Sequence, residues 1–334
     1  MTKPIAHITR GDIVECIQNG DAVVVNYKGE ILYSHGDPHK ESFIRSAAKP
    51  LQTLEVFKTG AADRYNFSQK ELSIMCASHY GEEFHVETVK DILSKIGLQK
   101  EDLQCGEMYS MKPAVAHRQM KLAQEKSSFF SCCSGKHSGM LAICEAMGWD
   151  RNGYYREEHP VQQGMLETIA HMCQMNKNDI GIGIDGCGVP VFSMPIYNMA
   201  LSYARFSKGN DPVYGKWCQT VYEAMASEPE MLAGTNGFCS DLTKAAKGKF
   251  VGKLGADGVY CIGIRDLGIG IALKIESGDI KCIPPVIMDI LGKLKLIDPS
   301  IDEELKKYKC LPNRNHLRDK IGEIISTIDL QVYL

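Results

Sequence analysis

The fold is decided by residues 250–275, which read FVGKLGADGVYCIGIRDLGIGIALKI. The stretch holds three short runs rich in β-branched and apolar residues, 250–253, 259–264 and 269–275, with glycine-containing turns between them. Runs of this composition bounded by turn residues predict β-strands, and short connections favour antiparallel neighbours. The segment therefore predicts three adjacent strands of an antiparallel or mixed sheet.

Two further strands are expected near the N-terminus. Residues 22–25 (AVVV) and 31–33 (ILY) flank a short glycine-containing turn, which is the pattern of a β-hairpin. In the middle of the sequence apolar residues recur at spacings of three and four, and Ser68 with Glu71 forms a capping box before one such stretch. The middle of the chain is therefore predicted to be helical.

Strands at both ends and helices between them predict an α/β (α+β) fold in which an antiparallel or mixed sheet, built from N- and C-terminal segments, carries an inserted helical lobe. We expect a single two-lobed domain over residues 1–334. Its sheet lobe comprises about 1–45 and 180–334, and its helical lobe about 46–179. Amphipathic patterns around 286–296 and 317–325 predict two further helices packed against the sheet.

The charge balance favours a small molecule as the partner. The 334 residues include 38 basic and 41 acidic side chains, a net charge of −3, without long runs of one sign. Nucleic acid and membranes are therefore not expected as partners. No apolar stretch approaches the roughly 18 residues that a membrane helix needs. The thirteen cysteines are an odd number, and no signal-peptide pattern is seen, so we expect a reducing, cytoplasmic location.

The first candidate for chemistry is RSAAKP at residues 45–50. Ser46 and Lys49 are three residues apart, so on a helical turn the lysine amine can take the proton of the serine hydroxyl. A lysine acts as a base only where desolvation or neighbouring positive charge lowers its pKa, and Arg45 can supply such a charge. The alternative is a serine helix cap followed by a solvated lysine.

Two other segments carry polar side chains that are candidates for a catalytic role. Residues 77–82 read ASHYGE, and Ser78 is expected at the end of a helix, where its hydroxyl can face a pocket; the alternative is an ordinary polar helix end. Lys253 lies inside a predicted strand, where a lysine can be shielded from water; the alternative is an exposed lysine beside a turn.

A third group is typical of a metal site. Cys133 and Lys136 in CSGKH (133–137) and Cys187 in DGCGVP (185–190) can give zinc two thiolates and one amine with a fourth position open. The alternative is a set of buried free cysteines. Residues 181–186 also fit G-x-G-x-x-G, but extended residues follow them where a dinucleotide site needs a helix, so a dinucleotide site is rejected.

In this order, the motifs resemble the asparaginase II family, the rhizobial-type (class 3) L-asparaginases. The resemblance extends from residue 20 to about residue 273. The segments that carry it are 45–50, 77–82, 133–137, 185–190 and 253–256.

This resemblance implies a fold similar to serine β-lactamases and glutaminases, a homodimer, and hydrolysis of L-asparagine to L-aspartate and ammonia through a Ser-Lys acyl-enzyme. It implies two Ser-Lys tandems, Ser46 with Lys49 and Ser78 with Lys253, of which Ser46 is the expected nucleophile.

The resemblance also implies zinc as a cofactor. Its ligands are matched by Cys133, Lys136 and Cys187, and the ion is expected to hold neighbouring side chains in place. The substrate surroundings are matched by Arg45, His137, Asp185 and Cys239.

The chain departs from the family pattern at two positions, Met108 and Gly237, where a histidine and a basic residue are expected. Two alternative functions stay open at this point. One is a zinc- or thiol-based binding or redox protein, which the number of cysteines favours. The other is another S-x-x-K acyl-transfer amidase of glutaminase or β-lactamase type, although a Lys-Thr-Gly strand signature is missing.

Overall fold

The structure is a computed structural model that describes residues 1–333. The chain forms two compact units. The sheet unit comprises residues 1–47, 194–208 and 245–334, and the helical unit comprises residues 48–193 and 209–244. No helix within residues 1–333 combines the length and the apolar character needed to cross a membrane.

The sheet unit is built on one antiparallel sheet with the strand order β10-β11-β1-β2-β9-β8-β7; β3 pairs with β2, and β12 pairs with β3. Its elements are β1 (Lys3–Arg10), β2 (Ile13–Asn26), β3 (Ile31–His35), β4 (Glu41–Phe43), α8 (Ile196–Lys208), β7 (Phe250–Gly255), β8 (Val259–Ile264), β9 (Ile269–Ile275), α11 (Ile283–Lys293), α12 (Pro299–Leu305), β10 (Leu311–Arg314), β11 (Lys320–Ser326) and β12 (Gln331–Val332).

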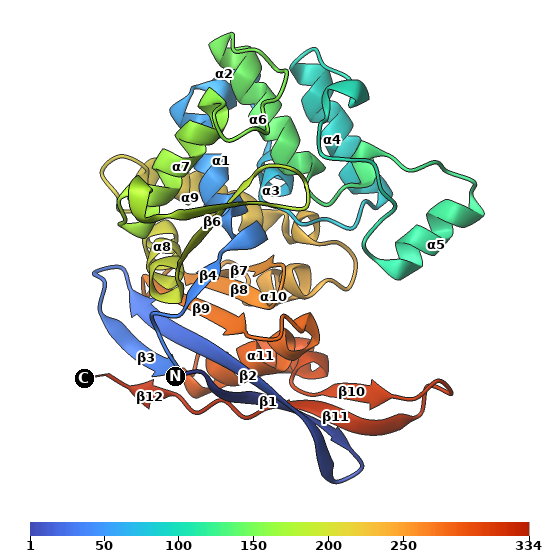
Figure 1. The fold of residues 1–334 in the computed structure, drawn as a ribbon, viewed down its shortest axis with the longest axis vertical. Coiled ribbons are helices and arrows are strands. Elements are labelled where there is room, and N and C mark those ends of the chain that lie inside the picture. The colour runs from blue at the N-terminus through green and yellow to red at the C-terminus, as the bar shows by residue number, and fades with distance from the viewer. Residues whose placement is uncertain (334) are drawn as a thin grey trace. The chain divides into compact units, whose positions relative to one another are not determined.

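Strands from the two ends of the chain lie side by side in this sheet, as Figure 1 shows in blue and orange. Ala22 of β2 is opposite Leu273 of β9, and Val24 is opposite Ile271. The four residues 22–25 are fully buried, which explains why this run is apolar without alternation. The predicted hairpin, the three predicted strands and the fold class are therefore confirmed.

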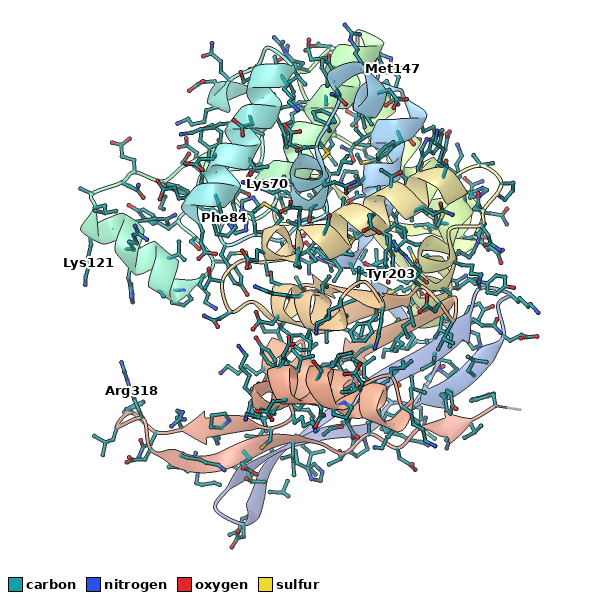
Figure 2. All side chains as sticks on the ribbon, turned by 180° about the vertical axis from the view of Figure 1, so that it is seen from behind. Lys70, Phe84, Lys121, Met147, Tyr203 and Arg318 are labelled. Atoms are coloured by element: carbon teal, nitrogen blue, oxygen red, sulfur yellow. The ribbon has the colours of Figure 1, made fainter. Side chains whose placement is uncertain are left out.

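Helix α8 packs on β2, β8 and β9 at very close range. A Cβ atom added to Gly270 of β9 would lie 1.8 Å from the carbonyl oxygen of Ala200, so only glycine allows this approach. Tyr203 of α8, labelled in Figure 2, donates a 2.7 Å hydrogen bond to the carbonyl of Ala47. The helix thereby supports the segment that precedes Lys49.

The helical unit contains most of the helices. Its elements are α1 (Lys49–Lys58), α2 (Ala61–Tyr65), α3 (Gln69–Met75), α4 (Glu83–Lys95), α5 (Pro113–Lys121), α6 (Ser134–Met147), α7 (Pro160–Cys173), β5 (Gly181–Ile184) and α9 (Gly215–Ser227). Three elements cross the unit boundaries: the 3-10 turn Arg45–Ala48, β6 (Pro190–Pro195) and α10 (Phe238–Ala246).

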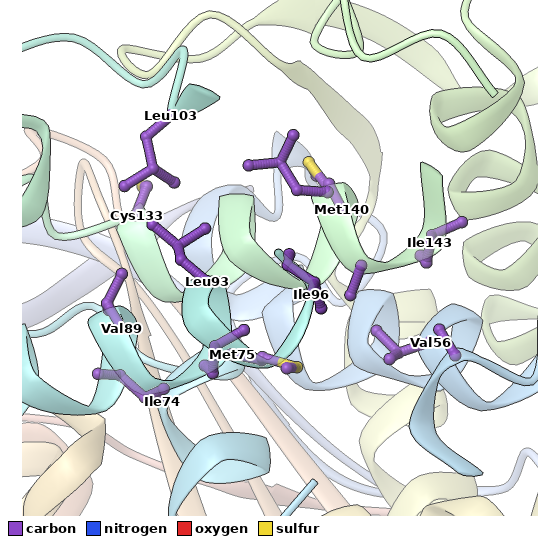
Figure 3. Packing of buried hydrophobic residues seen from close by; sticks show 14 of the residues in the cluster. Val56, Ile74, Met75, Val89, Leu93, Ile96, Leu103, Cys133, Met140 and Ile143 are labelled. Carbon is purple, nitrogen blue, oxygen red and sulfur yellow. The ribbon is translucent and has the colours of Figure 1, made fainter. Parts of the chain in front are cut away.

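A buried apolar cluster lies between α1, α3, α4 and α6, and Figure 3 shows its packing around Met75, Leu93 and Met140. The predicted capping box is present at the start of α3, where Ser68 and Glu71 exchange side-chain to backbone hydrogen bonds. After β5 a turn leads into β6, with which β5 pairs. The glycine pattern at 181–186 is thus followed by a strand.

Two expectations from the sequence differ from the structure. The predicted helix over 317–325 is wrong, because these residues form a turn around Arg318 and strand β11, which pairs with β10 and β1 (Figure 2). Residues 180–193 and 209–244 belong to the helical unit, whereas we expected them in the sheet lobe.

Candidate active site

The amine of Lys49 is the centre of the candidate site in the helical unit. Lys49 is the first residue of α1 and is fully buried. Its Nζ lies 3.2 Å from Oγ of Ser78, 2.5 Å from the carbonyl oxygen of Ala77 and 3.2 Å from the carbonyl oxygen of Cys132. A lysine amine has three hydrogen-bonding positions beyond its carbon, and the number of these contacts matches them.

Ser78 lies in a short extended segment after α3. The backbone N–H of Ser78 donates to Leu232, and that of Tyr80 donates to Ala233, at 2.9 and 2.8 Å. Between them His79 is fully buried, with Nε2 2.9 Å from the hydroxyl oxygen of Ser134. Ser78 and Tyr80 are both partly exposed, as expected when side chains alternate along an extended chain.

Arg45 and Ser46 lie in the sheet unit, on the 3-10 turn that leads directly into α1. Arg45 has a backbone φ of 50°, which is uncommon for a residue with a side chain. Such strain is often found at functional sites. Its guanidinium forms an ion pair with Asp257. Ser46 is half-buried, one turn before Lys49.

Lys253 also lies in the sheet unit, in β7 opposite Cys261 of β8. It is fully buried, and its Nζ donates to the carbonyl oxygen of Leu254 at 2.7 Å. Of the two interpretations of Lys253, the structure shows the lysine that is shielded from water. The two tandems, Ser46 with Lys49 and Ser78 with Lys253, stay a prediction.

The fold brings together the three predicted zinc ligands in the helical unit. Cys133 and Lys136 lie at the start of α6, and Nζ of Lys136 is 3.4 Å from Sγ of Cys187, which follows β5. Sγ of Cys132 is 3.8 Å from Sγ of Cys133. All of these thiols are free.

The charges in this cluster are strongly coupled. Hydrogen bonds from the thiols of Cys132 and Cys187, with the positive charges of Lys49 and Lys136, hold the pKa of Cys133 well below its ordinary value. Burial opposes the charged form of Lys136, but the sulfurs of Cys187 and Cys133 outweigh burial and raise its pKa. The cluster thus stabilises a thiolate beside an ammonium.

These donors fit zinc in chemistry, because thiolates and a nitrogen are ligand types that zinc binds, and the Cys187 sulfur lies close to both Lys136 and Cys133. Within residues 1–333 no three His, Cys, Asp or Glu side chains are grouped so as to hold a metal. A metal here therefore needs Lys136 as its third ligand, and that lysine has to lose its proton on binding.

Three predicted substrate-contact residues lie in the helical unit. His137 is fully buried, and burial followed by the charge of Lys136 lowers its pKa to about 3. Asp185 is half-buried beside Cys187, and its Oδ1 accepts from the N–H of Gly186 at 2.8 Å. Cys239 is buried at the start of α10. Burial, followed by the nearby Cys239, raises the pKa of Tyr80 to about 12.

Sequence reasoning missed two groups that contact these residues. Tyr154 places its hydroxyl 2.7 Å from Nδ1 of His137. The backbone carbonyl of Cys132 accepts from Lys49. No spacing rule connects residues 154 and 137, and a backbone carbonyl leaves no trace in a sequence pattern, so only the fold reveals these contacts.

The sequence profile of the L-asparaginase II family matches residues 6–326, nearly the whole chain. The chain therefore belongs to the L-asparaginase II family. No curated protein matches the chain in a direct sequence search.

Several solved structures are similar at low identity. A candidate beta-lactamase from Bacteroides dorei is 13% identical over 82% of this chain and 93% of its own, with a TM-score of 0.43. Mglu in its native form is 12% identical over 78% of this chain, with a TM-score of 0.42, and the match spans 56% of its length. A penicillin-binding protein homologue from Pyrococcus abyssi is 14% identical over 87% and 76%, with a TM-score of 0.35. The family assignment rests on the sequence profile alone.

Proposed function

We propose that this protein is a rhizobial-type L-asparaginase, which hydrolyses L-asparagine to L-aspartate and ammonia through a covalent ester on a serine. The family assignment supports an amide as the substrate. The observation that carries the proposal is the part-buried contact of 3.2 Å between Nζ of Lys49 and Oγ of Ser78. It joins a serine hydroxyl and a lysine amine at the distance that proton transfer needs.

The surroundings of Lys49 define how a neutral amine would bind there. The carbonyl oxygens of Ala77 and Cys132 can only accept hydrogen bonds, so they take the two N–H groups of the amine. The lone pair is then directed at the remaining neighbour, the hydroxyl of Ser78, which can donate its proton. This arrangement is that of a general base that acts through a neutral amine.

The reaction follows the ordinary course of acyl transfer. Lys49 takes the serine proton as the oxygen forms a bond to the side-chain amide carbon of asparagine. The C–N bond then breaks, and ammonia leaves with the proton held by Lys49. Water attacks the aspartyl ester and gives its proton to Lys49. L-Aspartate is released, and the serine hydroxyl is restored.

Two serines are candidates for the nucleophile. Ser46 is the one that the spacing to Lys49 predicts, and it stays our first proposal. The contact of Lys49 with Ser78 is a specific observation in favour of the second serine. Proteolysis after lysine and arginine leaves the two serines on separate peptides, so the peptide that carries the ester identifies the nucleophile.

For the substrate, we propose that Asp185 binds the α-amino group and Arg45 the α-carboxylate, with His137 and Cys239 completing the surroundings. The charges of Arg45 and Asp185 suit these two groups. Arg45 is paired with Asp257, a residue that is 70% exposed at its side chain, so the α-carboxylate replaces a partner that is only weakly held.

We also propose that Cys133, Lys136 and Cys187 hold zinc, which would fix the geometry of α6 and of the turn after β5. Ser-Lys chemistry needs no metal-bound water, so the ion is assigned a structural role. A homodimer in the cytoplasm completes the proposal; the odd number of cysteines, thirteen, is consistent with a reducing environment.

The test is ammonia release from L-asparagine, L-glutamine and a β-aspartyl ester, measured side by side with purified protein. The proposal predicts ammonia release from L-asparagine. Absence of ammonia release from L-asparagine by folded protein would contradict it, and release from L-glutamine alone would favour the alternative of a glutaminase. Sedimentation velocity in the same preparation tests the dimer.

A further inference from the structure

A buried tyrosine holds the imidazole ring of His137. Tyr154 and His137 are both fully buried, and the rings meet edge to face with centroids 5.5 Å apart. The Tyr154 hydroxyl lies 2.7 Å from Nδ1 of His137 and accepts a 3.0 Å hydrogen bond from the backbone N–H of Gln104. The other ring nitrogen, Nε2, is buried without a hydrogen-bond partner among residues 1–333.

The numbers of hydrogen-bond donors and acceptors around Tyr154 and His137 indicate which ring nitrogen of His137 carries the hydrogen atom. If the tyrosine O–H donates to Nδ1, the ring carries its own hydrogen on Nε2, and only that N–H lacks a partner. If Nδ1 donates to the tyrosine oxygen, the hydroxyl hydrogen of Tyr154 has no acceptor and Nε2 has no donor. The first arrangement leaves one buried group unsatisfied and the second leaves two, so the first is favoured.

The unsatisfied N–H belongs to a residue that adjoins the proposed zinc ligands in the sequence. His137 directly follows Lys136 on α6, and its backbone N–H donates to the carbonyl oxygen of Cys133 at 3.0 Å, so His137 belongs to the same helical turn as these two proposed zinc ligands. A buried donor without an acceptor costs free energy, and such groups in folded proteins call for a specific explanation. An oxygen atom of a bound ligand supplies the missing acceptor.

We propose that Tyr154 is a positioning residue that fixes His137 as an Nε2–H donor to an oxygen of the substrate. The inference deepens the proposed function and rests on it. The acceptor is the side-chain amide oxygen or the α-carboxylate of asparagine, and kinetics separate the two. Loss of a donor to the amide oxygen, where negative charge develops, lowers kcat, whereas loss of a donor to the carboxylate raises KM.

The test compares Tyr154→Phe with Tyr214→Phe. Both replacements remove one buried hydroxyl from the helical unit, and the Tyr214 hydroxyl contacts only Thr168, at 3.2 Å, among the hydrogen bonds recorded for it. We expect Tyr154→Phe to lower kcat/KM for L-asparagine by about tenfold, the size of one lost hydrogen bond, and Tyr214→Phe to leave it unchanged. Thermal unfolding of both variants checks that they fold.

A second readout reports the ring directly. In protein labelled with 15N-histidine, with the His137 signals identified by their loss in His137→Gln, we expect an Nε2–H tautomer in the wild type. Titration with the product L-aspartate is expected to shift that N–H signal. In Tyr154→Phe the tautomer is expected to become mixed, which a loss of stability alone would not cause.

An Nδ1–H tautomer in the wild type overturns the inference, as does equal activity of Tyr154→Phe and Tyr214→Phe. An unchanged N–H signal at saturating L-aspartate, in a wild type that hydrolyses L-asparagine, overturns the substrate contact while the proposed function stands. A wild type that neither hydrolyses L-asparagine nor binds L-aspartate contradicts both this inference and the proposed function.

Discussion

At the scale of single residues, the proposed reaction depends on Nζ of Lys49 as its general base. Replacing this lysine by methionine removes the base, and replacing it by arginine puts in its place a positively charged group that cannot lose its proton at working pH. We expect both variants to lower kcat by about 10²- to 10⁴-fold, the usual contribution of a general base. The measurement is ammonia release per folded protein.

The matched control for Lys49 is Lys90→Met, which removes an exposed lysine from α4 of the same unit. It is expected to leave kcat unchanged. Activity of Lys49→Arg close to that of the wild type would show that the lysine acts only through its charge.

His85 gives a prediction for pH. It is buried, with Nδ1 accepting from the N–H of Glu82, and burial lowers its pKa from 6.5 to about 4. Below pH 6.5 His85 binds a proton in the unfolded chain but stays neutral in the folded protein. The free energy of unfolding is therefore highest above this pH and falls as the pH drops towards 4. We expect His85 to lower the free energy of unfolding by about 2 kcal/mol between pH 7 and pH 5.

The measurement is urea unfolding at pH 7 and pH 5. His85→Gln keeps an acceptor and a donor but does not titrate, so its loss between the two pH values is expected to be smaller than that of the wild type. The control His316→Gln replaces an exposed histidine. Equal losses in the wild type and in His85→Gln would contradict the prediction.

At the scale of elements, the close contact of α6 with α3 positions Lys136 and Cys133. A Cβ atom on Gly135 would lie 2.2 Å from the carbonyl oxygen of Ile74, so Gly135→Ala must push the helices apart. We expect a loss of about 3 kcal/mol. Gly292→Ala in α11 meets no atom within 4 Å and is expected to stabilise by about 0.5–1 kcal/mol. Denaturant unfolding measures both, and equal effects would exclude this account.

Some elements could be predicted from the sequence because their signals are local. The hairpin at 22–33 and the strands within 250–275 carry their own composition and turns. Strand β11 could not be predicted from the sequence, because it forms by pairing with β1, some 300 positions away in the sequence. The two strands are so close that a Cβ atom on Gly322 would lie 1.9 Å from the carbonyl oxygen of Thr9. The apolar spacing of 317–325 by itself resembles a helix.

The same distinction applies to the candidate site. Ser46 and Lys49 are visible as a local motif, since three residues make one turn. The neighbours of Lys49, such as Ala77 and Cys132, come from other segments and appear only when the chain is folded. The link between Tyr154 and His137 is of the same kind.

At the scale of the whole molecule, the proposed zinc joins segments about fifty residues apart and is expected to stabilise the fold. Purified protein should hold one zinc per chain by elemental analysis, and a chelator should lower its melting temperature. Cys133→Ser and Cys187→Ser are expected to lose the metal, whereas Cys144→Ser, which replaces another buried cysteine of α6, is expected to keep it. Full zinc content in Cys187→Ser, or none in the wild type, would disprove the assignment.

The central claim is that amide hydrolysis passes through an ester on a serine that Lys49 deprotonates. It is tested most directly by quenching the wild type with acid during turnover of L-asparagine and mapping the modified peptides by mass spectrometry. We predict an aspartyl adduct on the peptide that holds Ser46 or on the one that holds Ser78, and its absence from Lys49→Met. Accumulation of L-aspartate with neither peptide modified at any time point would contradict the claim.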